Sequence, residues 1–519
     1  FKICRGVMMT MKKFLATICA AALLMTGCGD GRQQASTGEK TFTYGTVAYG
    51  TAMENVGTNP HESYSGWSTL RYGIGETLFK FNERMELEPW LAESFEQVDD
   101  FTVKIKINDA AKFSNGKKVD GAAVKACLEA LIKNHDRAPR DLKISAIEAD
   151  GQFVTIKSAE KVPALLNYLS DPYGCIVDVA AGVNDKIVVG TGAYKAVKVT
   201  DTQIDLAPNE NYWGSVKPKM NKIIVKSITD GDTLTMAMQN GELDAVQGLP
   251  YASLKLFGDG YKISQADTSR VYQIAFNFKT SELQDLNVRK AISMAIDKEN
   301  FCKVLLDGNG TPAIGAFPAN LTFGGDAVKA TPYDLDGAKK LLADSGWNDS
   351  DGDGYVDKDG KNLELNYLTY TSRQELPLLA EAAQANLKKI GVKLNVNATD
   401  NYKTFLKSGE YDIFSKAIVT APTGDGEYYF TSHIVPGAVD NAGFYDSPQI
   451  VALENELHNT FGADKRSELA VKMSQQVLDD CALIYAAHLK MSLVMKPNVE
   501  GFTAHPSDYY EITPELDKK

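Results

Sequence analysis

The sequence predicts an α/β fold in more than one lobe, and two observations support this prediction. Stretches that alternate apolar and polar residues, as half-buried strands do, recur between stretches with the periodicity of helices. The length is the second observation, because 519 residues are enough for two or three domains of ordinary size.

The first half of the chain contains four predicted strands and one long predicted helix. The strands are residues 41–49, 101–107, 223–225 and 272–278, which are rich in apolar and β-branched residues. Residues 119–134 are predicted to be helical because Val124, Leu128 and Leu131 recur on one face. This order of elements is typical of a mixed sheet covered by helices.

The second half repeats the alternation with more helix. The predicted helices are residues 288–306, 335–345 and 374–390, and the predicted strands are residues 363–368 and 392–396. Gly346 ends the second of these helices, and Gly391 separates the last helix from the last strand. A second α/β lobe is therefore expected here.

The N-terminal segment has the layout of a lipoprotein signal. An apolar run follows Lys12 and Lys13, is too short to span a bilayer, and ends in LMTGC at residues 24–28. This ending resembles a lipobox, so residues 1–27 are predicted to be leader and signal peptide and Cys28 the lipidated residue. The alternative is an ordinary signal peptide with an incidental cysteine. Residues 28–40, GDGRQQASTGEK after the cysteine, are predicted to be a flexible tether.

Charge and cysteine content exclude several classes of partner. Residues 1–27 hold four basic and no acidic residues, which leaves 51 basic and 67 acidic residues, a formal charge of −16. This balance argues against nucleic acid and anionic lipid, so contact with the membrane is expected only through the lipid anchor. The cysteines beyond Cys28 are widely spaced, and we interpret them as small buried residues rather than ligands. They are Cys127, Cys175, Cys302 and Cys481.

Several short motifs resemble one protein family. They are residues 89–94 (PWLAES), 112–116 (KFSNG), 190–194 (GTGAY), 209–214 (NENYWG), 241–244 (GELD) and 287–297 (NVRKAISMAID). In this order they resemble the extracellular solute-binding proteins of the dipeptide, oligopeptide and nickel importer family. The resemblance runs from about residue 41 to the C-terminus and is strongest to the nickel-binding members.

The resemblance implies a two-lobed periplasmic-binding-protein fold with mixed β-sheets and a ligand cleft between the lobes. Lobe I would comprise residues 41–276 with an extra subdomain, lobe II residues 277–492, and residues 493–519 would return to lobe I. The implied protein is a monomer that works outside the cytoplasm, at the cell surface or in the periplasm, and delivers its ligand to the permease subunits of an ABC importer.

The implied cargo is nickel or a nickel chelate with a histidine-like chelator. A dipeptide or oligopeptide is the alternative, and a free amine-bearing chelator is the third candidate. Nickel would be a transported ligand, and no prosthetic group is expected. In some nickel-type members two loop histidines bind the metal, and the matching residues here are His61 and His505, each beside a proline.

Other residues are expected at the cleft. Arg71 could hold a chelator carboxylate bidentately, or could instead pair with Glu76 or another acid. Some nickel-type members use cleft arginines in the segment that matches residues 165–178, but this segment contains no arginine here. Arg137 and Arg140, in another matching segment, are expected to take the place of those arginines. The remaining expected ligand-binding residues are Trp67, Tyr428, Tyr429 and His433; tyrosines in a core would give the same pattern.

Residues 348–360 (NDSDGDGYVDKDG) open like a calcium loop, with Asp349, Asp351 and Asp353 at alternate positions. Position twelve is Gly360, where an EF-hand has its bidentate glutamate. We interpret the segment as an acidic turn, with weak calcium binding by the three aspartates as the alternative.

An enzyme is the competing class of function. The sequence contains no HExxH, GxSxG, GxGxxG or GxxxxGK motif. A hydrolase therefore remains only a remote alternative, and the protein is expected not to be an enzyme.

Overall fold

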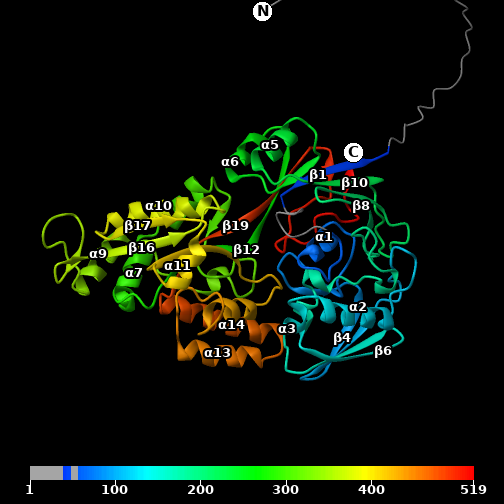
Figure 1. Cartoon of the computed structure of the whole chain (residues 1–519), viewed down its shortest axis with the longest axis horizontal. Helices are drawn as coiled ribbons and strands as arrows, with labels where there is room; N and C mark the ends of the chain where they lie inside the picture. The colour runs from blue at the N-terminus through cyan, green and yellow to red at the C-terminus, as the bar shows by residue number, and fades with distance from the viewer. Residues whose placement is uncertain (1–38, 48–56) are drawn as a thin grey trace, which may run out of the picture. The chain divides into compact units, whose positions relative to one another are not determined.

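The computed structural model describes residues 39–47 and 57–519. Cys28, the predicted signal peptide and nearly all of the predicted tether lie outside the described residues. Lys40–Lys519 form one compact unit, drawn in colour in Figure 1. Within the described ranges, no helix combines the length and apolar character needed to cross a bilayer.

The largest sheet has 11 strands and runs through both lobes. Its strands in spatial order are β17 (Lys393–Ala398), β16 (Glu364–Thr369), β18 (Ile413–Val419), β12 (Lys262–Phe276), β19 (Leu483–Met495), β11 (Ala245–Gln247), β1 (Thr41–Thr46), β10 (Lys222–Ser227), β9 (Gln203–Pro208) and β8 (Tyr194–Val199), with β13 (Gly310–Pro312) beside β19. Strand β1 is parallel to β10 and β11, and β16 is parallel to β17 and β18, whereas the other pairs are antiparallel. The sheet is therefore mixed, as predicted.

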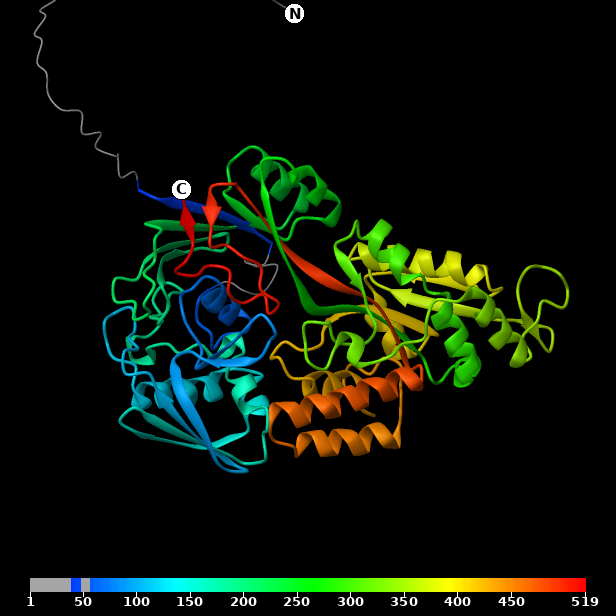
Figure 2. The same cartoon turned by 180° about the vertical axis from the view of Figure 1, so that it is seen from behind.

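Strands β12 and β19 connect the two lobes. They pair antiparallel over most of their length, with an interruption in register between Asp267 and Val271. On one side of it β19 pairs with β11, and on the other β12 pairs with β18 through Arg270–Phe276. Figures 1 and 2 show both strands side by side between the two lobes. The chain thus passes between the lobes on two adjacent strands.

Lobe I contains a separate four-stranded antiparallel sheet. Its strands in order are β4 (Ala92–Asp99), β5 (Thr102–Ile107), β7 (Phe153–Ser158) and β6 (Ile144–Asp150). Helix α2 (Gly121–Asn134) starts at Asp120, whose carboxylate accepts a hydrogen bond from the Ala123 amide. Its buried Val124, Leu128 and Leu131 join the core of this sheet, as the periodicity predicts.

The remaining elements of lobe I are short and surround the sheets. They are α1 (Ser65–Arg71), α3 (Ala138–Leu142), α4 (Leu165–Tyr168), α5 (Gly231–Gln239), α6 (Tyr251–Leu254), the pair β2 (Phe79–Phe81) and β3 (Leu87–Pro89), and the terminal pair β20 (Val499–Glu500) and β21 (Asp517–Lys518). The C-terminal segment packs in the same core as β1, since Phe42 and Tyr44 contact Phe502.

Lobe II is built on β16, β17 and β18. Its helices are α7 (Leu286–Ala295), α8 (Lys298–Asn300), α9 (Leu335–Asp344), α10 (Glu375–Lys388), α11 (Tyr402–Ser408), α12 (Glu427–Tyr429), α13 (Pro448–His458) and α14 (Ala463–Asp479), and a small ladder joins β14 (Asp357–Lys358) to β15 (Lys361–Asn362). One core joins Phe276 of β12 to Val288 and Ile292 of α7 and Leu379 and Leu387 of α10.

The prediction of one helix over residues 288–306 is wrong. Helix α7 ends at Ala295, and Ile296 has an extended ψ of 109°. The carboxylate of Asp297 then accepts a hydrogen bond from the Asn300 amide and starts α8, which continues into a π-helical turn. The aspartate side chain accepts a hydrogen bond from a backbone N–H group at the start of the second helix. It therefore favours a new helix start over continuation of the first helix.

The two lobes share an apolar contact. Leu70, Met85 and Tyr509 of lobe I belong to the same buried cluster as Phe317 and Tyr429 of lobe II. Such a contact removes apolar surface of both lobes from water. Lobe II therefore rests against lobe I at the segment that precedes α12.

Candidate ligand site between the lobes

The lobe I wall of the site begins at helix α1. Trp67 and Arg71 are four residues apart and therefore lie on one face of the helix. The Arg71 guanidinium carbon lies 5.1 Å from the centre of the Trp67 ring, and that ring contacts Tyr509 with centroids 5.6 Å apart. A cation over an indole face and a perpendicular aromatic pair both stabilise this arrangement.

Arg71 is only 1% exposed and is held by the C-terminal segment. Its Nε donates to the Asp508 carbonyl at 2.9 Å, and Nη2 donates to Asp508 Oδ2 at 2.6 Å. Its Nε also lies 3.4 Å from Glu511 Oε1. The guanidinium also forms a hydrogen bond with the Tyr72 side chain. Arg71 is therefore held in place on several sides.

The partner of Arg71 is not Glu76. Glu76 accepts hydrogen bonds from the Tyr212 hydroxyl at 3.1 Å and the Trp213 indole at 2.7 Å. Burial raises the pKa of Glu76 to about 7. This carboxyl group belongs to a separate cluster in lobe I.

Asp508 and Glu511 share one negative charge. Burial raises the pKa of Asp508 and raises that of Glu511 to about 8. The two carboxyl groups are hydrogen-bonded to each other, and the Tyr44 hydroxyl donates to Glu511 Oε2 at 2.6 Å. Two adjoining buried carboxyl groups cannot both ionise at low cost, so Glu511 keeps its proton and Arg71 balances Asp508.

Two further arginines lie close to each other nearby. Burial and the neighbouring guanidinium of Arg373 lower the pKa of Arg270, while the Asp508 charge opposes this. Arg270 lies on β12, and Arg373 is exposed just before α10. Across the described ranges, neither side chain makes a hydrogen bond or ion pair, although the Glu375 carboxylate acts on the same tyrosines, Tyr251 and Tyr272, as Arg373 does.

The charge of Arg137 in lobe I acts on Tyr428 in lobe II. Arg137 Nη2 donates to Asp171 Oδ2 at 2.5 Å, and its guanidinium lies 5.2 Å from the Tyr173 ring centre. The charges of Arg137 and Asp171 both affect the pKa of Tyr428, which burial raises. Arg140 points elsewhere: it is 71% exposed and pairs with its neighbour Asp141.

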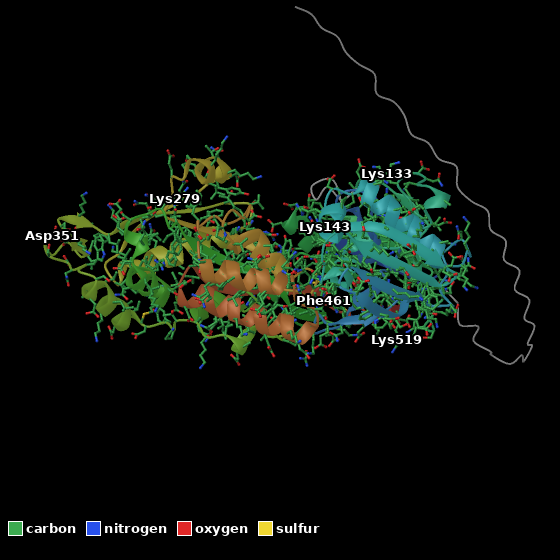
Figure 3. All side chains as sticks on the ribbon, turned by 90° about the horizontal axis from the view of Figure 1, so that it is seen from below. Lys133, Lys143, Lys279, Asp351, Phe461 and Lys519 are labelled. Atoms are coloured by element: carbon green, nitrogen blue, oxygen red, sulfur yellow. The ribbon has the colours of Figure 1, made fainter. Side chains whose placement is uncertain are left out.

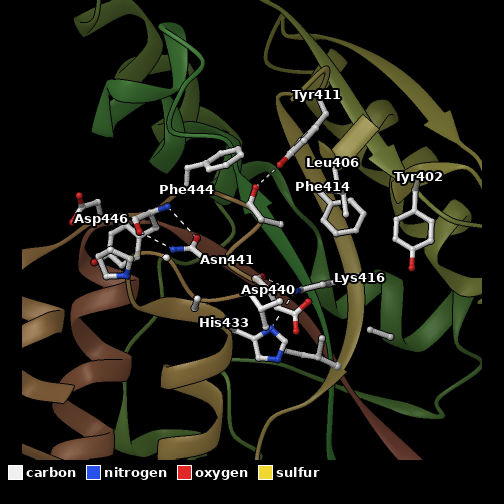
Figure 4. Close-up of a pocket in the computed structure, with 18 of the residues that line it drawn as sticks. Tyr402, Leu406, Tyr411, Phe414, Lys416, His433, Asp440, Asn441, Phe444 and Asp446 are labelled. Carbon is white, nitrogen blue, oxygen red and sulfur yellow. Dashed lines mark hydrogen bonds between the residues drawn. The ribbon is translucent and has the colours of Figure 1, made fainter. Parts of the chain in front are cut away.

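A cavity of about 590 Å³ lies in lobe II and contains His433 (Figure 4). Lys416 Nζ donates to His433 Nδ1 at 3.1 Å and to the Asp440 carbonyl at 2.9 Å. Burial lowers the pKa of Lys416 to about 8 and that of His433 to about 3. The imidazole is therefore neutral, and its Nδ1 lone pair is occupied by the lysine.

Tyr429 is a core residue rather than a cleft residue. It is fully buried, and its hydroxyl bonds Gln273 Oε1 at 3.0 Å and the Tyr485 hydroxyl at 2.7 Å. Its ring stacks on His433 with centroids 5.6 Å apart. Tyr429 therefore positions His433, whereas Tyr428 is the partly exposed tyrosine of the pair.

His61 is buried against helix α2. Its Nε2 lies 3.6 Å from Cys127 Sγ, and burial with the neighbouring His135 ring lowers its pKa to about 4. His135 is fully engaged, because its Nδ1 accepts from the Arg137 and Ala138 amides and its Nε2 bonds the Ser63 carbonyl. His61 is therefore neutral at neutral pH, which is the form that binds metals.

His505 occupies a different environment in the C-terminal segment. Its Nδ1 lies 2.7 Å from Ser507 Oγ, and its ring packs on Tyr510 with centroids 4.8 Å apart. Burial lowers its pKa to about 4. The backbone of Asn82 and Phe81 lies beside the ring and opposes this lowering of the pKa. Among the described residues, no contact joins His505 to His61, and no metal-ligand group contains both.

The segment between β18 and α12 makes the contact between the lobes. The Asn167 side chain donates to the Thr423 carbonyl at 2.8 Å, and the Tyr509 hydroxyl donates to the Pro422 carbonyl at 2.9 Å. Gly424 has a φ of +67° and lies so close to Met85 that an added Cβ would meet the Met85 carbonyl oxygen at 2.3 Å. The close approach of the lobes here requires glycine.

The three aspartates of the predicted turn are exposed at the outer end of lobe II, where Figure 3 labels Asp351. Their side-chain oxygens lie within 4.8 Å of one another, as a cation would require. Asp349 accepts from the Gly352 and Gly354 amides, and Asp353 accepts from the Tyr355 amide. These bonds already account for an acidic turn.

Sequence reasoning missed Asp508, Glu511, Arg270, Arg373 and Lys416. Asp508 and Glu511 follow His505 closely, and two acids three residues apart beside a predicted loop site were a usable signal. Arg270 and Arg373 are 103 positions apart, and nothing in the sequence pairs them.

Comparison with known proteins identifies the family of the chain. Residues 86–437 match the model of the bacterial extracellular solute-binding proteins, family 5 middle. The chain is 26% identical over 505 residues, 96% of this chain and 98% of the relative, to the nickel-binding protein NikA of Staphylococcus aureus. It is 23% identical to the oligopeptide-binding protein AppA of Bacillus subtilis, over 97% of this chain and 98% of that protein.

A crystal structure of a nickel ABC transporter protein from Bacillus halodurans has a TM-score of 0.82 and 27% identity, covering 92% of this chain and all of that one. Proteins of this family bind solutes outside the cytoplasm for ABC permeases; they are not enzymes and use no prosthetic group. The described chain has their two-lobed fold. The chain belongs to the bacterial extracellular solute-binding proteins of family 5 and is a substrate-binding protein of the nickel and peptide importers.

Proposed function

We propose that this protein captures nickel as a complex with a small carboxylate-bearing chelator and delivers it to its permease. One observation carries the proposal: within the described residues, the side chains of Arg270 and Arg373 make no ion pair, although the two guanidinium groups lie close enough to affect each other. A ligand with several carboxylates would satisfy these donors.

The charge balance favours a chelate over a free peptide. In a nickel complex of amino-acid chelators the amino nitrogens bind the metal, so the complex presents carboxylates and no ammonium group. A peptide brings an ammonium group that needs an acid. Of the described acids near these arginines, Asp508 is paired with Arg71, Glu511 is protonated, and Glu375 accepts a hydrogen bond from the Tyr272 hydroxyl.

His61 and His505 are the proposed nickel donors. Burial keeps both imidazoles neutral, and a neutral imidazole offers nickel a nitrogen lone pair. The relative from Staphylococcus aureus is described as nickel-binding, which supports this cargo. Both histidines cannot ligate one ion without movement of the C-terminal segment, so we propose that the ligand draws His505 inward as the lobes close.

Isothermal titration of the mature protein tests the proposal. The ligands are Ni²⁺ alone, Ni²⁺ with excess L-histidine, and a dipeptide and oligopeptide mixture. We expect the nickel–histidine complex to bind, and His505→Ala and His61→Ala to weaken it. If only peptides bind, or if both variants retain the affinity of the wild type, the nickel proposal fails.

A peptide is the second candidate cargo. Asp440 is exposed at the cavity of Figure 4, and its carboxylate could accept a peptide ammonium group. The likeness to an oligopeptide-binding protein over nearly the whole chain also favours this candidate. Asp440→Asn should then abolish peptide binding and leave nickel–histidine binding intact.

We further propose that Cys28 carries a lipid and that residues 29–40 tether lobes I and II to the membrane. Diacylation would hold the protein on the membrane surface. Cys28→Ser should release the protein from the membrane fraction, and a variant that stays bound would contradict the anchor.

A further inference from the structure

A second group of metal-binding side chains lies in lobe II. Glu454 and His458 are four residues apart on α13, and Glu427 approaches them from α12. One ligand atom of each residue lies within 4.8 Å of the others, and His458 Nδ1 is 2.7 Å from Glu427 Oε1. None of the three residues lines the cavity of Figure 4.

We infer that Glu427, Glu454 and His458 form a binding site for a divalent transition metal, separate from the cargo cleft. One imidazole and two carboxylates are ligands of Zn²⁺, Co²⁺ and Ni²⁺, and three protein ligands leave positions for water. Bonds of about 2.0–2.2 Å place ligand atoms about 3 Å apart. His458 is 44% exposed, so it can make this small shift and leaves an entry path.

Arg466 holds Glu427 and the C-terminal end of α13 in position without a bound metal. Its Nη2 donates to Glu427 Oε2 at 2.6 Å, which leaves Oε1 toward His458. Its Nη1 donates to the Leu457 and Thr460 carbonyls at the end of α13, beside His458. One arginine therefore holds both ligand-bearing helices, as residues around a metal's ligands commonly do.

The charges around the site also fit a divalent cation. Asp425, Glu427 and Glu454 are acidic, and Asp425 and Glu427 share the single cation Arg466. With a neutral His458 this group carries a formal charge of −2, which one divalent ion cancels.

The site adjoins lobe I. Thr423, four residues before Glu427, accepts a hydrogen bond from the side chain of Asn167 in lobe I. A bound metal would hold Glu427 to α13 and thereby stiffen the segment that touches lobe I.

The experiment is a Co²⁺ titration of the mature protein without histidine, followed by visible ligand-field absorption. We expect one Co²⁺ to bind with an intense spectrum in the wild type. Glu454→Gln and His458→Gln should weaken binding by more than about tenfold, since even changes around a metal's ligands cost 10–100-fold. Glu454 makes no hydrogen bond within the described chain, so its variant should keep its melting temperature. Glu456→Gln, exposed on the same helix, is the matched control.

Two outcomes of the Co²⁺ titration would refute the metal site. If Glu454→Gln and Glu456→Gln bind Co²⁺ alike, or if only His458→Gln changes binding, His458 binds metal as an isolated surface histidine and the site is refuted. The titration is repeated in the His61→Ala, His505→Ala double variant. The spectrum should persist there even if the nickel cargo proposal fails, which separates the two conclusions.

Discussion

Arg71 Nη2 lies 2.6 Å from Asp508 Oδ2, although 437 positions separate the two residues in the chain. The C-terminal segment thus supplies the counter-charge of a helix near the start of the folded chain. Because Arg71 is buried and its partner carboxylate adjoins Glu511, this pair stabilises lobe I.

Arg71→Met should destabilise the protein. Removing the cation leaves Asp508 and Glu511 buried without compensation, and breaking a buried ion pair costs about 3–5 kcal/mol. Urea denaturation measures the free energy of unfolding. Arg84→Met is the control, because Arg84 is 65% exposed and its ion pair with Glu86 lies at the surface. Equal midpoints for the two variants would contradict the structural role of Arg71.

Arg373→Met should weaken ligand binding without loss of stability. Arg373 is exposed and unpaired within the described residues, so the fold does not depend on it. A charge-assisted hydrogen bond contributes about 1.5–3 kcal/mol, which corresponds to roughly 10- to 100-fold in affinity. Calorimetric titration with the nickel–histidine complex measures this effect. An unchanged affinity would remove Arg373 from the site.

Gly424→Ala should hinder closure of the lobes. The new Cβ would meet the Met85 carbonyl oxygen at 2.3 Å, so lobe II could no longer rest on lobe I at this point. A tenfold lower population of the closed form lowers the apparent affinity about tenfold. Gly241→Ala is the matched control, because Gly241 has a similar φ of +79° but nothing within 4 Å of an added Cβ. Both variants bear the same backbone strain, and only Gly424→Ala should lose affinity.

Glu76 should make stability fall as pH rises toward neutrality. Its folded pKa of about 7 lies above its ordinary value of 4.5. Between these values the folded protein holds a proton that the unfolded chain has released, so stability is full below pH 4.5 and is lost as pH rises through 7. Glu76→Gln should flatten this dependence in thermal unfolding between pH 4.5 and 7.5.

The control for that experiment is Glu93→Gln. Glu93 pairs with Lys106 at the surface, and its side chain is 49% exposed. Its variant should therefore show the pH dependence of the wild type. A wild-type slope in Glu76→Gln as well would refute the role of Glu76.

Local patterns predicted most elements of the fold. Helix α2 and strand β16 were found because their apolar spacing, 3.6 or 2 residues, is set by neighbours in sequence. The prediction failed over residues 288–306. The residues on both sides of Asp297 have the apolar periodicity of one continuous helix, but Asp297 caps a second helix. Strand β12 begins ten residues before its predicted start, because its first half is polar and is stabilised by pairing with β19.

The sequence by itself determined the α/β class and the resemblance to the solute-binding family, because these depend on local spacing and ordered motifs. The tertiary structure alone decided that Trp67 and Arg71 share a helix face, that Arg71 pairs with Asp508, that His61 and His505 lie in separate environments, and that Tyr429 is a core residue. The reason is physical: the charge and availability of a side chain depend on which distant groups burial brings against it, and no local pattern records that choice.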